Sequence, residues 1–238
     1  MPVITVSGYL ASGAREIAQQ AAVELRLEFV DQMILVEAAR ELGVTVEAME
    51  DRDERTTSIG ERVAAALGLL MERSAAVGTF DPVSGGGMGL ETVLTRTYGE
   101  AAELPSGGTR GQLDDDRYIK TLTSVIKGVA ARGDVVLLGR GSQAILQDAP
   151  GTLHVYIAAS KEWRIQNLVT REGMSRPDAE HRIEKSDANR QAFHRRYFKV
   201  EFNSPQQYDM AINAGRISSP VAAKMIAVGA AERAPKPG

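Results

Sequence analysis

The sequence predicts an α/β protein built on a parallel, doubly wound sheet. Short apolar runs rich in β-branched residues recur along the chain, and helical hydrophobic patterns separate them. Each of these runs also closes in glycine or polar residues, which is typical of a strand that ends at a turn. The 238 residues suffice for one large core, and we expect residues 1–238 to form a single domain.

The same patterns predict the elements in chain order. The first strand, Val3 to Val6, ends in Ser7-Gly8, and further strands are expected at 28–31, 134–138, 153–158 and 210–212. The expected helices cover residues 15–26, 32–41, 59–73, 115–132, 161–172, 176–197 and 220–233. Ligands of such sheets bind at the carboxyl ends of the strands. We therefore expect the residues that follow the strands at 3–6, 134–138 and 153–158 to lie close together.

Residues 78–112 differ from the rest of the chain. They contain Gly85-Gly86-Gly87, further glycines and two prolines among scattered polar residues. We interpret this stretch as a flexible insertion. Whether it is a plain surface loop or an element that covers a substrate stays open.

Composition narrows the class of protein. Hydrophobic residues make up 43% and charged residues 25% of the chain, which is usual for a globular domain. The net charge of −3 argues against a nucleic acid polymer or an anionic membrane as partner. There is no cysteine, no basic apolar leader and no apolar run of bilayer length, so we expect a cytoplasmic protein. Homo-oligomerisation stays open.

A glycine-containing loop joins the first strand to its helix. Gly8 and Gly13 stand at the separation of a phosphate loop, in which main-chain N–H groups wrap a phosphate at a helix N-terminus. Ala14 stands where that pattern has lysine, and Arg15 stands where Ser or Thr would hold a magnesium ion. Arg15 could replace the missing charge, because guanidinium binds phosphate oxygens, but it cannot coordinate a cation. The alternative is a turn that binds no ligand.

Three segments of the first half resemble the cytidylate kinase-like family. They are Ile4-Thr-Val-Ser7, Ala11-Ser-Gly-Ala-Arg-Glu-Ile-Ala18 and Phe29-Val-Asp31. Members of that family often carry a Gly-Ser-Gly-Gly-Arg-Glu-Ile-Ala loop that also lacks the lysine. The resemblance implies a three-layer P-loop NTPase-like fold with a helical lid, here a lid-like arm at about 171–197.

The second half carries two more segments of the resemblance. Leu138-Gly-Arg140-Gly141 matches the stretch whose arginine binds the acceptor phosphate, although the true kinases commonly have aspartate where Gly141 stands. Asp187-Ala-Asn-Arg190 matches an element whose aspartate and arginine contact the acceptor nucleotide. Asp31 matches a position near the acceptor site, and an equally good reading of it is a helix N-cap.

The resemblance implies a kinase, a transferase that moves phosphate from ATP to a nucleoside monophosphate such as CMP. The donor phosphates would be bound by Gly8, Ser12, Gly13, Ala14 and Arg15. The acceptor would be bound by Asp31, Arg140, Asp187 and Arg190. The catalytic cations would be Arg15, Arg182 and Lys185, since phosphoryl transfer needs several charges around the moving group.

Two alternatives accompany this reading. The arginines of 171–196 alternate with carboxylates and could form a solvated helix face. The altered loop could also belong to a catalytically inactive protein that senses a nucleotide or another phosphorylated ligand. Mg²⁺ would be held by water, nucleotide phosphates or a carboxylate, with no metal ligand predicted in the loop. The histidines His154, His181 and His194 are read as structural.

Overall fold

The computed structural model describes residues 1–31, 38 and 115–233. Five parallel strands form one sheet in the order β2-β3-β1-β4-β5. Their bounds are β1 Val3–Gly8, β2 Glu28–Val30, β3 Val135–Leu138, β4 Thr152–Ala158 and β5 Met210–Asn213. The first strand of the chain therefore lies in the centre of the sheet, with β3 and β4 on either side.

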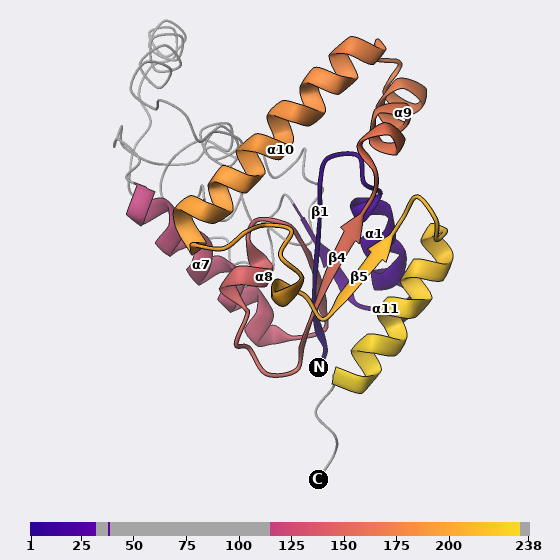
Figure 1. Cartoon of the computed structure of the whole chain (residues 1–238). Helices are drawn as coiled ribbons and strands as arrows, with labels where there is room; N and C mark the ends of the chain where they lie inside the picture. Colours follow the sequence, from indigo (N-terminus) through magenta and orange to yellow (C-terminus); the bar gives the residue numbers. More distant parts are fainter. Residues whose placement is uncertain (32–37, 39–114, 234–238) are drawn as a thin grey trace, which may run out of the picture.

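Helices cover both faces of this sheet, which gives three layers (Figure 1). The helices α1 (Ala14–Leu25) and α11 (Ser219–Arg233) pack on one face, and α7 (Asp115–Arg132) and the short α8 (Ser142–Ile145) lie on the other. The last two, α9 (Lys161–Glu172) and α10 (Arg176–Phe198), extend over the carboxyl end of the sheet. No helix in the described ranges combines the length and apolarity needed to cross a bilayer.

Two apolar cores explain the layers. All six residues of β1 are buried, because side chains that alternate between the faces meet a helix on each side. Ile4 and Val6 pack with Ile17 of α1 and Ile226 of α11, while Val3 packs with the α7 residues. Its apolar residues Val3, Ile4 and Val6 supply these contacts, and the buried hydroxyls of Thr5 and Ser7 hydrogen-bond to His154 and Gln143.

The predicted fold class is confirmed, a parallel α/β sheet of the P-loop NTPase-like kind. The predicted helix at 115–132 coincides with α7, and the other described strands and helices differ from their predicted bounds by at most two residues. The short α8 was not predicted. The insertion at 78–112 and the helices expected at 32–41 and 59–73 lie outside the described residues, apart from residue 38.

The lid-like arm expected at about 171–197 corresponds to the end of α9 and to α10. Each of these helices begins with a serine N-cap, Ser160 and Ser175, whose side chain accepts a main-chain N–H. Gly173, in the left-handed conformation, ends α9. These signals place the turn between the two helices at 173–175.

Candidate functional site

In the loop between β1 and α1, atoms of Ser12, Ala14 and Ile157 pack closely around Gly8. A Cβ on Gly8 would lie 2.5 Å from Ser12 Oγ, 2.8 Å from Ala14 Cβ and 2.9 Å from the carbonyl oxygen of Ile157. Only glycine fits at this point, where the end of β1 passes under the start of α1 and beside β4. The sequence pattern thus has a steric reason in this chain.

The N-terminus of α1 carries polar groups that have no partner within the helix. Gly13 is the N-cap, with φ 83°, and makes no side-chain capping hydrogen bond. The first N–H groups of a helix have no partner within it, and the helix dipole adds positive potential there. Ser12 is 1% exposed and its hydroxyl has no hydrogen-bond partner, although its main-chain N–H donates to the Tyr9 carbonyl at 3.1 Å. These groups form a cradle that suits an anion.

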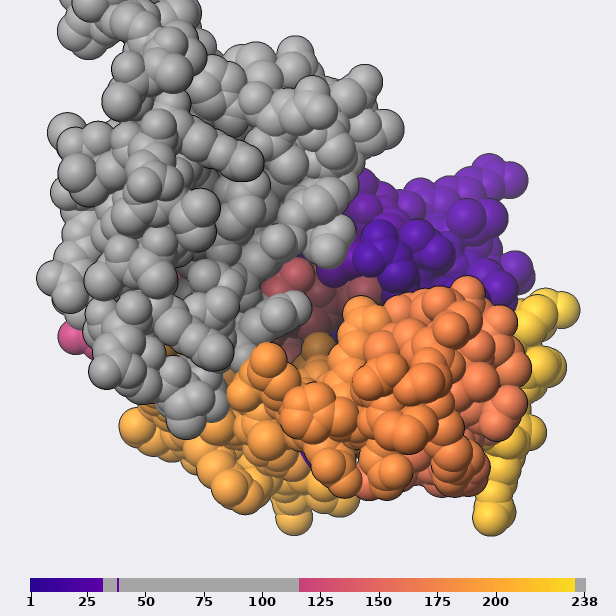
Figure 2. All heavy atoms as spheres, turned by 90° about the horizontal axis from the view of Figure 1, so that it is seen from above, coloured from indigo at the N-terminus to yellow at the C-terminus, as the bar shows by residue number. Residues whose placement is uncertain are grey.

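A cavity of about 850 Å³ lies above this cradle. Figure 2 looks onto this end of the molecule, where the indigo N-terminal segment and the orange arm face each other. Among the described residues that line the cavity, six side chains are cationic and three are carboxylates. The cations are Arg15, Arg140, Arg171, Arg182, Lys185 and Arg190, and the carboxylates are Glu16, Asp31 and Glu172.

Arg15 and Asp31 form an ion pair at the cavity wall. Arg15 Nη1 lies 2.5 Å from Asp31 Oδ2, with the arginine side chain 55% and the aspartate 12% exposed. Burial raises the pKa of Asp31, and the nearby charges of Arg140, Arg15 and Arg190 oppose that shift. The three cations thus favour the ionised form of the carboxylate, which burial disfavours. Asp31 lies just beyond β2 and lines the cavity, and its role toward an acceptor stays a prediction.

Arg140 lines the same cavity from the turn after β3. Gly139, Arg140 and Gly141 all have positive φ, at 69°, 58° and 72°. At Gly141 a Cβ would lie 2.3 Å from Cε2 and 2.6 Å from Cζ of Phe198, the last residue of α10. The aromatic ring thus occupies the space that a side chain at position 141 would need.

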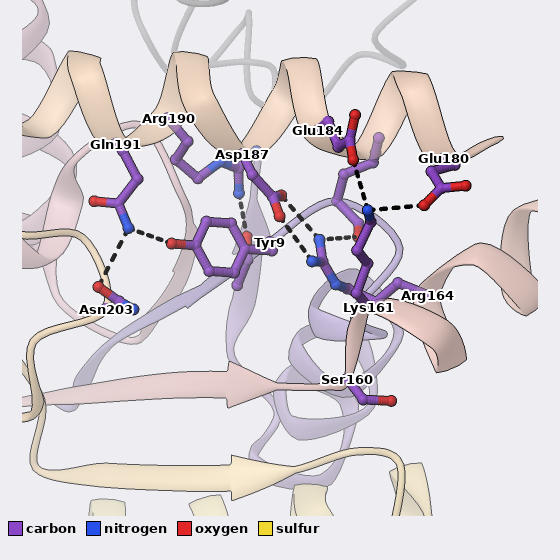
Figure 3. Close-up of polar contacts among 12 residues, drawn as sticks. Tyr9, Ser160, Lys161, Arg164, Glu180, Glu184, Asp187, Arg190, Gln191 and Asn203 are labelled. Atoms are coloured by element: carbon purple, nitrogen blue, oxygen red, sulfur yellow. Dashed lines mark hydrogen bonds and ion pairs between the residues drawn. The ribbon is translucent and has the colours of Figure 1, made fainter. Parts of the chain in front are cut away.

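Two residues expected to bind the acceptor are held by protein groups. Arg190 lines the cavity, but its Nη1 donates to the carbonyl oxygen of Gly8. Asp187 accepts two hydrogen bonds from Arg164, at 2.8 and 2.7 Å (Figure 3). Among the described residues, Asp187 does not belong to the cavity lining. The acceptor roles of these two residues remain predictions; in the structure Arg190 contacts the loop directly and Asp187 contacts it through Arg164.

The expected catalytic cations of the arm lie at the cavity edge. Arg182 pairs with Glu172 at 2.5 Å, and both side chains are about half exposed. Lys185 lines the cavity and makes no ion pair within the described part of the chain. Exposed pairs of this kind contribute little to stability and exchange partners easily. Both cations are therefore available to an anionic ligand.

His194 is a cavity residue that the sequence reading treated as structural. It is 3% exposed, and its Nδ1 lies 2.8 Å from the carbonyl oxygen of Arg190. Because a carbonyl can only accept, Nδ1 carries the proton and Nε2 is an acceptor, which has no partner. Burial lowers the pKa of His194 to about 4, so the ring is neutral at physiological pH.

Sequence reasoning missed Arg164 and Asn167, which contact the loop from α9. Arg164 is 5% exposed and reaches the carbonyl oxygen of Leu10 at 3.4 Å, and Asn167 Nδ2 donates to that of Ala11 at 3.1 Å. Nothing in the local pattern separates Arg164 from the solvated arginines around it. The one signal in the sequence is the position of Arg164 beside Ile165 and four residues before Leu168, which places it on the buried side of α9.

The residues of the cavity fit the groups that a kinase needs. The Gly8 cradle, the unpartnered Ser12 hydroxyl and the cationic lining fit the phosphates of a nucleotide. Mg²⁺ usually needs only one or two carboxylates besides phosphates and water, and Asp31 is a carboxylate at the cavity that could serve. Within the described ranges, no cluster of three His, Asp or Glu side chains could hold a metal by itself.

Comparison with known proteins identifies the family. The model of the cytidylate kinase-like family matches residues 3–216, and the chain belongs to this family. It is thus a nucleotide-binding, kinase-like protein, as the resemblance in the sequence predicted. A search of curated proteins found no match.

Solved structures share the fold. A protein from Eubacterium ventriosum ATCC 27560, described as uncharacterized, is 16% identical with a TM-score of 0.60, covering 98% of this chain and 100% of that chain. A sugar kinase from Janibacter sp. HTCC2649 is 13% identical with a TM-score of 0.48, covering 99% and 96%. Shikimate kinase from Bacteroides thetaiotaomicron is 11% identical with a TM-score of 0.44, covering 94% and 96%. The fold assignment stands on the first of these and on the sheet itself.

Proposed function

We propose that the protein is a kinase that transfers the γ-phosphate of ATP to a nucleoside monophosphate such as CMP. One observation carries this proposal: the glycine loop at the start of α1 and Arg140 at the end of β3 line one cavity with an excess of cations. Membership of the cytidylate kinase-like family supports the reaction class and the acceptor.

The loop is the proposed donor site. Gly8 lets the main chain approach the phosphates, and the N–H groups of Gly13, Ala14 and Arg15 point from the first turn of α1. The Ser12 hydroxyl gains a partner when a phosphate oxygen arrives. The Arg15 guanidinium supplies charge that the loop lacks at Ala14, and to do so it shares or exchanges its bond with Asp31.

The opposite wall is the proposed acceptor site. Arg140 binds the phosphate of the nucleoside monophosphate, while Asp31 and Arg190 complete this wall. In this proposal Asp187 acts on the loop and not on the acceptor. The cavity volume of about 850 Å³ lies within the range of small-molecule sites, roughly 300–1,000 Å³.

The transfer itself is a displacement at phosphorus. The bond from the γ-phosphorus to the oxygen bridging it to the β-phosphate breaks, a bond to an acceptor phosphate oxygen forms, and ADP leaves. Arg15, Arg182 and Lys185 would neutralise charge on the transferring oxygens, where the loss of one such cation typically costs about 3–4 kcal/mol of barrier. A bound Mg²⁺ would supply further neutralisation of the phosphates.

A second candidate is a nucleotide sensor without transferase activity. The Arg15–Asp31 ion pair favours it, because the cation that would replace the lysine is already engaged by a carboxylate. Such a protein would bind ATP at the same loop and leave it intact.

One set of assays separates the two candidates. The purified protein is incubated with ATP, Mg²⁺ and a panel of nucleoside monophosphates, and ADP is measured. ADP formation that depends on CMP or UMP supports the kinase, and saturable ATP binding without ADP formation supports the sensor. In an active protein, Arg140→Ala should raise the KM of the acceptor more than that of ATP. Equal losses for both substrates would contradict the assignment of the two walls.

A further inference from the structure

The whole of α9 and α10, from here on called the arm, donates hydrogen bonds to carbonyl oxygens of the phosphate loop. Donors from α9 and α10 reach three carbonyls: Arg190 reaches Gly8, Arg164 reaches Leu10 and Asn167 reaches Ala11. The side chain of Tyr9, between them, takes a hydrogen bond from Gln191 and lies 5.2 Å under the guanidinium of Arg164. Every residue from Gly8 to Ala11 therefore contacts the arm.

Arg164 is fixed in place by its own partner. It is 5% exposed and forms a bidentate pair with Asp187, so its guanidinium joins α9, α10 and the loop at one point (Figure 3). A two-bond pair fixes the plane of both groups as well as their distance. Asp187 thus sets where Arg164 can donate.

A donor on a carbonyl also sets the direction of the following amide. The peptide bond is planar and none in the described residues is cis, so the C=O of residue n and the N–H of residue n+1 point in opposite directions. Donors held on the carbonyls of Leu10 and Ala11 therefore fix the N–H groups of Ala11 and Ser12; the Ser12 N–H closes the loop on the Tyr9 carbonyl, and the Ala11 N–H is the one left for a ligand. Ala11 itself has φ 59°, a conformation that a non-glycine residue keeps only when its surroundings hold it.

We infer that Arg164 and Asn167 are positioning residues of the phosphate loop and that Asp187 acts through Arg164. The arm holds the loop in the shape that presents its amides to an anion, in a chain whose loop has no lysine. This inference rests on the proposed function for its ligand. The structural part of the inference is that the arm sets the conformation of the loop. This part does not depend on the proposed function and can be tested without a ligand.

The chain offers a matched control for the arm. Arg176 and Glu162 form a second bidentate pair between α10 and α9, at 2.8 and 2.6 Å, with both side chains more than half exposed. This pair joins the same two helices, and neither residue belongs to the cavity lining or to the donors on the loop carbonyls. Its loss removes a link between the helices and leaves the contacts to the loop in place.

The test compares Asp187→Asn, Asn167→Ala and the control Glu162→Gln in the full chain. Hydrogen exchange of the peptide that spans residues 8–13 is measured without ligand, affinity for ATP by calorimetry, and global stability by urea denaturation. Asp187→Asn leaves a buried guanidinium without its carboxylate and could unfold the arm. Asn167→Ala removes only one neutral hydrogen-bond donor. If Asp187→Asn does not fold, Asn167→Ala alone tests the inference.

We expect the loop of Asn167→Ala, and of Asp187→Asn where it folds, to exchange faster, and ATP affinity to fall about tenfold. Glu162→Gln should leave both quantities unchanged. Unchanged loop exchange in Asn167→Ala, or an equal effect of Glu162→Gln, would overturn the inference. A wild-type chain that binds no ATP would refute the proposed function, and loop exchange would then decide the structural part alone.

Discussion

Replacement of Gly8 by alanine perturbs the loop at its tightest point. The added methyl group would meet three atoms closer than 3.0 Å: Ser12 Oγ, Ala14 Cβ and the Ile157 carbonyl oxygen. The serine hydroxyl can rotate away. The other two atoms belong to the first turn of α1 and to the backbone of β4, so relief requires the helix start to move away from the sheet.

The size of the effect follows from this geometry. Overpacking of a close-packed site costs about 1–3 kcal/mol, which in a chain of this length corresponds to a drop in Tm of about 2–4 °C per kcal/mol. Because the displaced element carries the amides that we propose to bind phosphate, affinity for ATP should fall by more than tenfold. Calorimetric unfolding and ATP titration measure the two effects on one preparation.

Gly128→Ala is the matched control. Gly128 lies inside α7, and a Cβ there would meet no atom within 4 Å. Alanine in a helix interior is better than glycine by about 0.5–1 kcal/mol, so this variant should be slightly more stable and bind ATP normally. A Gly8→Ala protein with unchanged Tm and unchanged ATP affinity would refute the reasoning about the loop.

Two further predictions concern the walls of the cavity. Gly141→Asp should destabilise the protein by about 3 kcal/mol or more, from strain at positive φ and overlap with Phe198, and Phe198→Ala should relieve the overlap in the double variant; additive losses in urea denaturation would contradict the contact. His194→Phe should flatten the acid dependence of stability. The folded pKa of His194 lies near 4, below the ordinary value near 6.5, so its contribution is complete above pH 6.5 and falls by about 3 kcal/mol toward pH 4. Parallel stability curves for variant and wild type over that range would exclude this role.

The sequence predicted the elements well because their signals are local. The buried strand Val3–Val6 and the helix after Gly13 show their burial in their own residue pattern. The glycine spacing also predicted the loop, since the steric need at Gly8 acts within one strand–turn–helix unit. Strand order is different, because it depends on which helices cover which face, and the described sheet places β1 between two strands more than 100 residues later in the chain.

The support of the loop could not be predicted for a physical reason. Arg164 and Arg176 look alike in the sequence, each on a helix rich in charges, yet one is buried against the loop and the other is exposed. The difference arises from tertiary contacts, since Arg164 meets Asp187 and the Leu10 carbonyl while Arg176 meets the exposed Glu162. The contacts of Asp187 with Arg164 and of Arg190 with the Gly8 carbonyl likewise join distant parts of the chain, which a local pattern does not show.

The central claim is that the turn between β1 and α1 binds a phosphate without a lysine. The most direct measurement is an NMR titration of the ¹⁵N-labelled protein with ATP, following the main-chain amides of Gly13, Ala14 and Arg15. The account predicts saturable shifts at these three amides, lost in Gly8→Ala and kept in Gly128→Ala. ATP binding that leaves the three amides unmoved, or no binding at all, would contradict it.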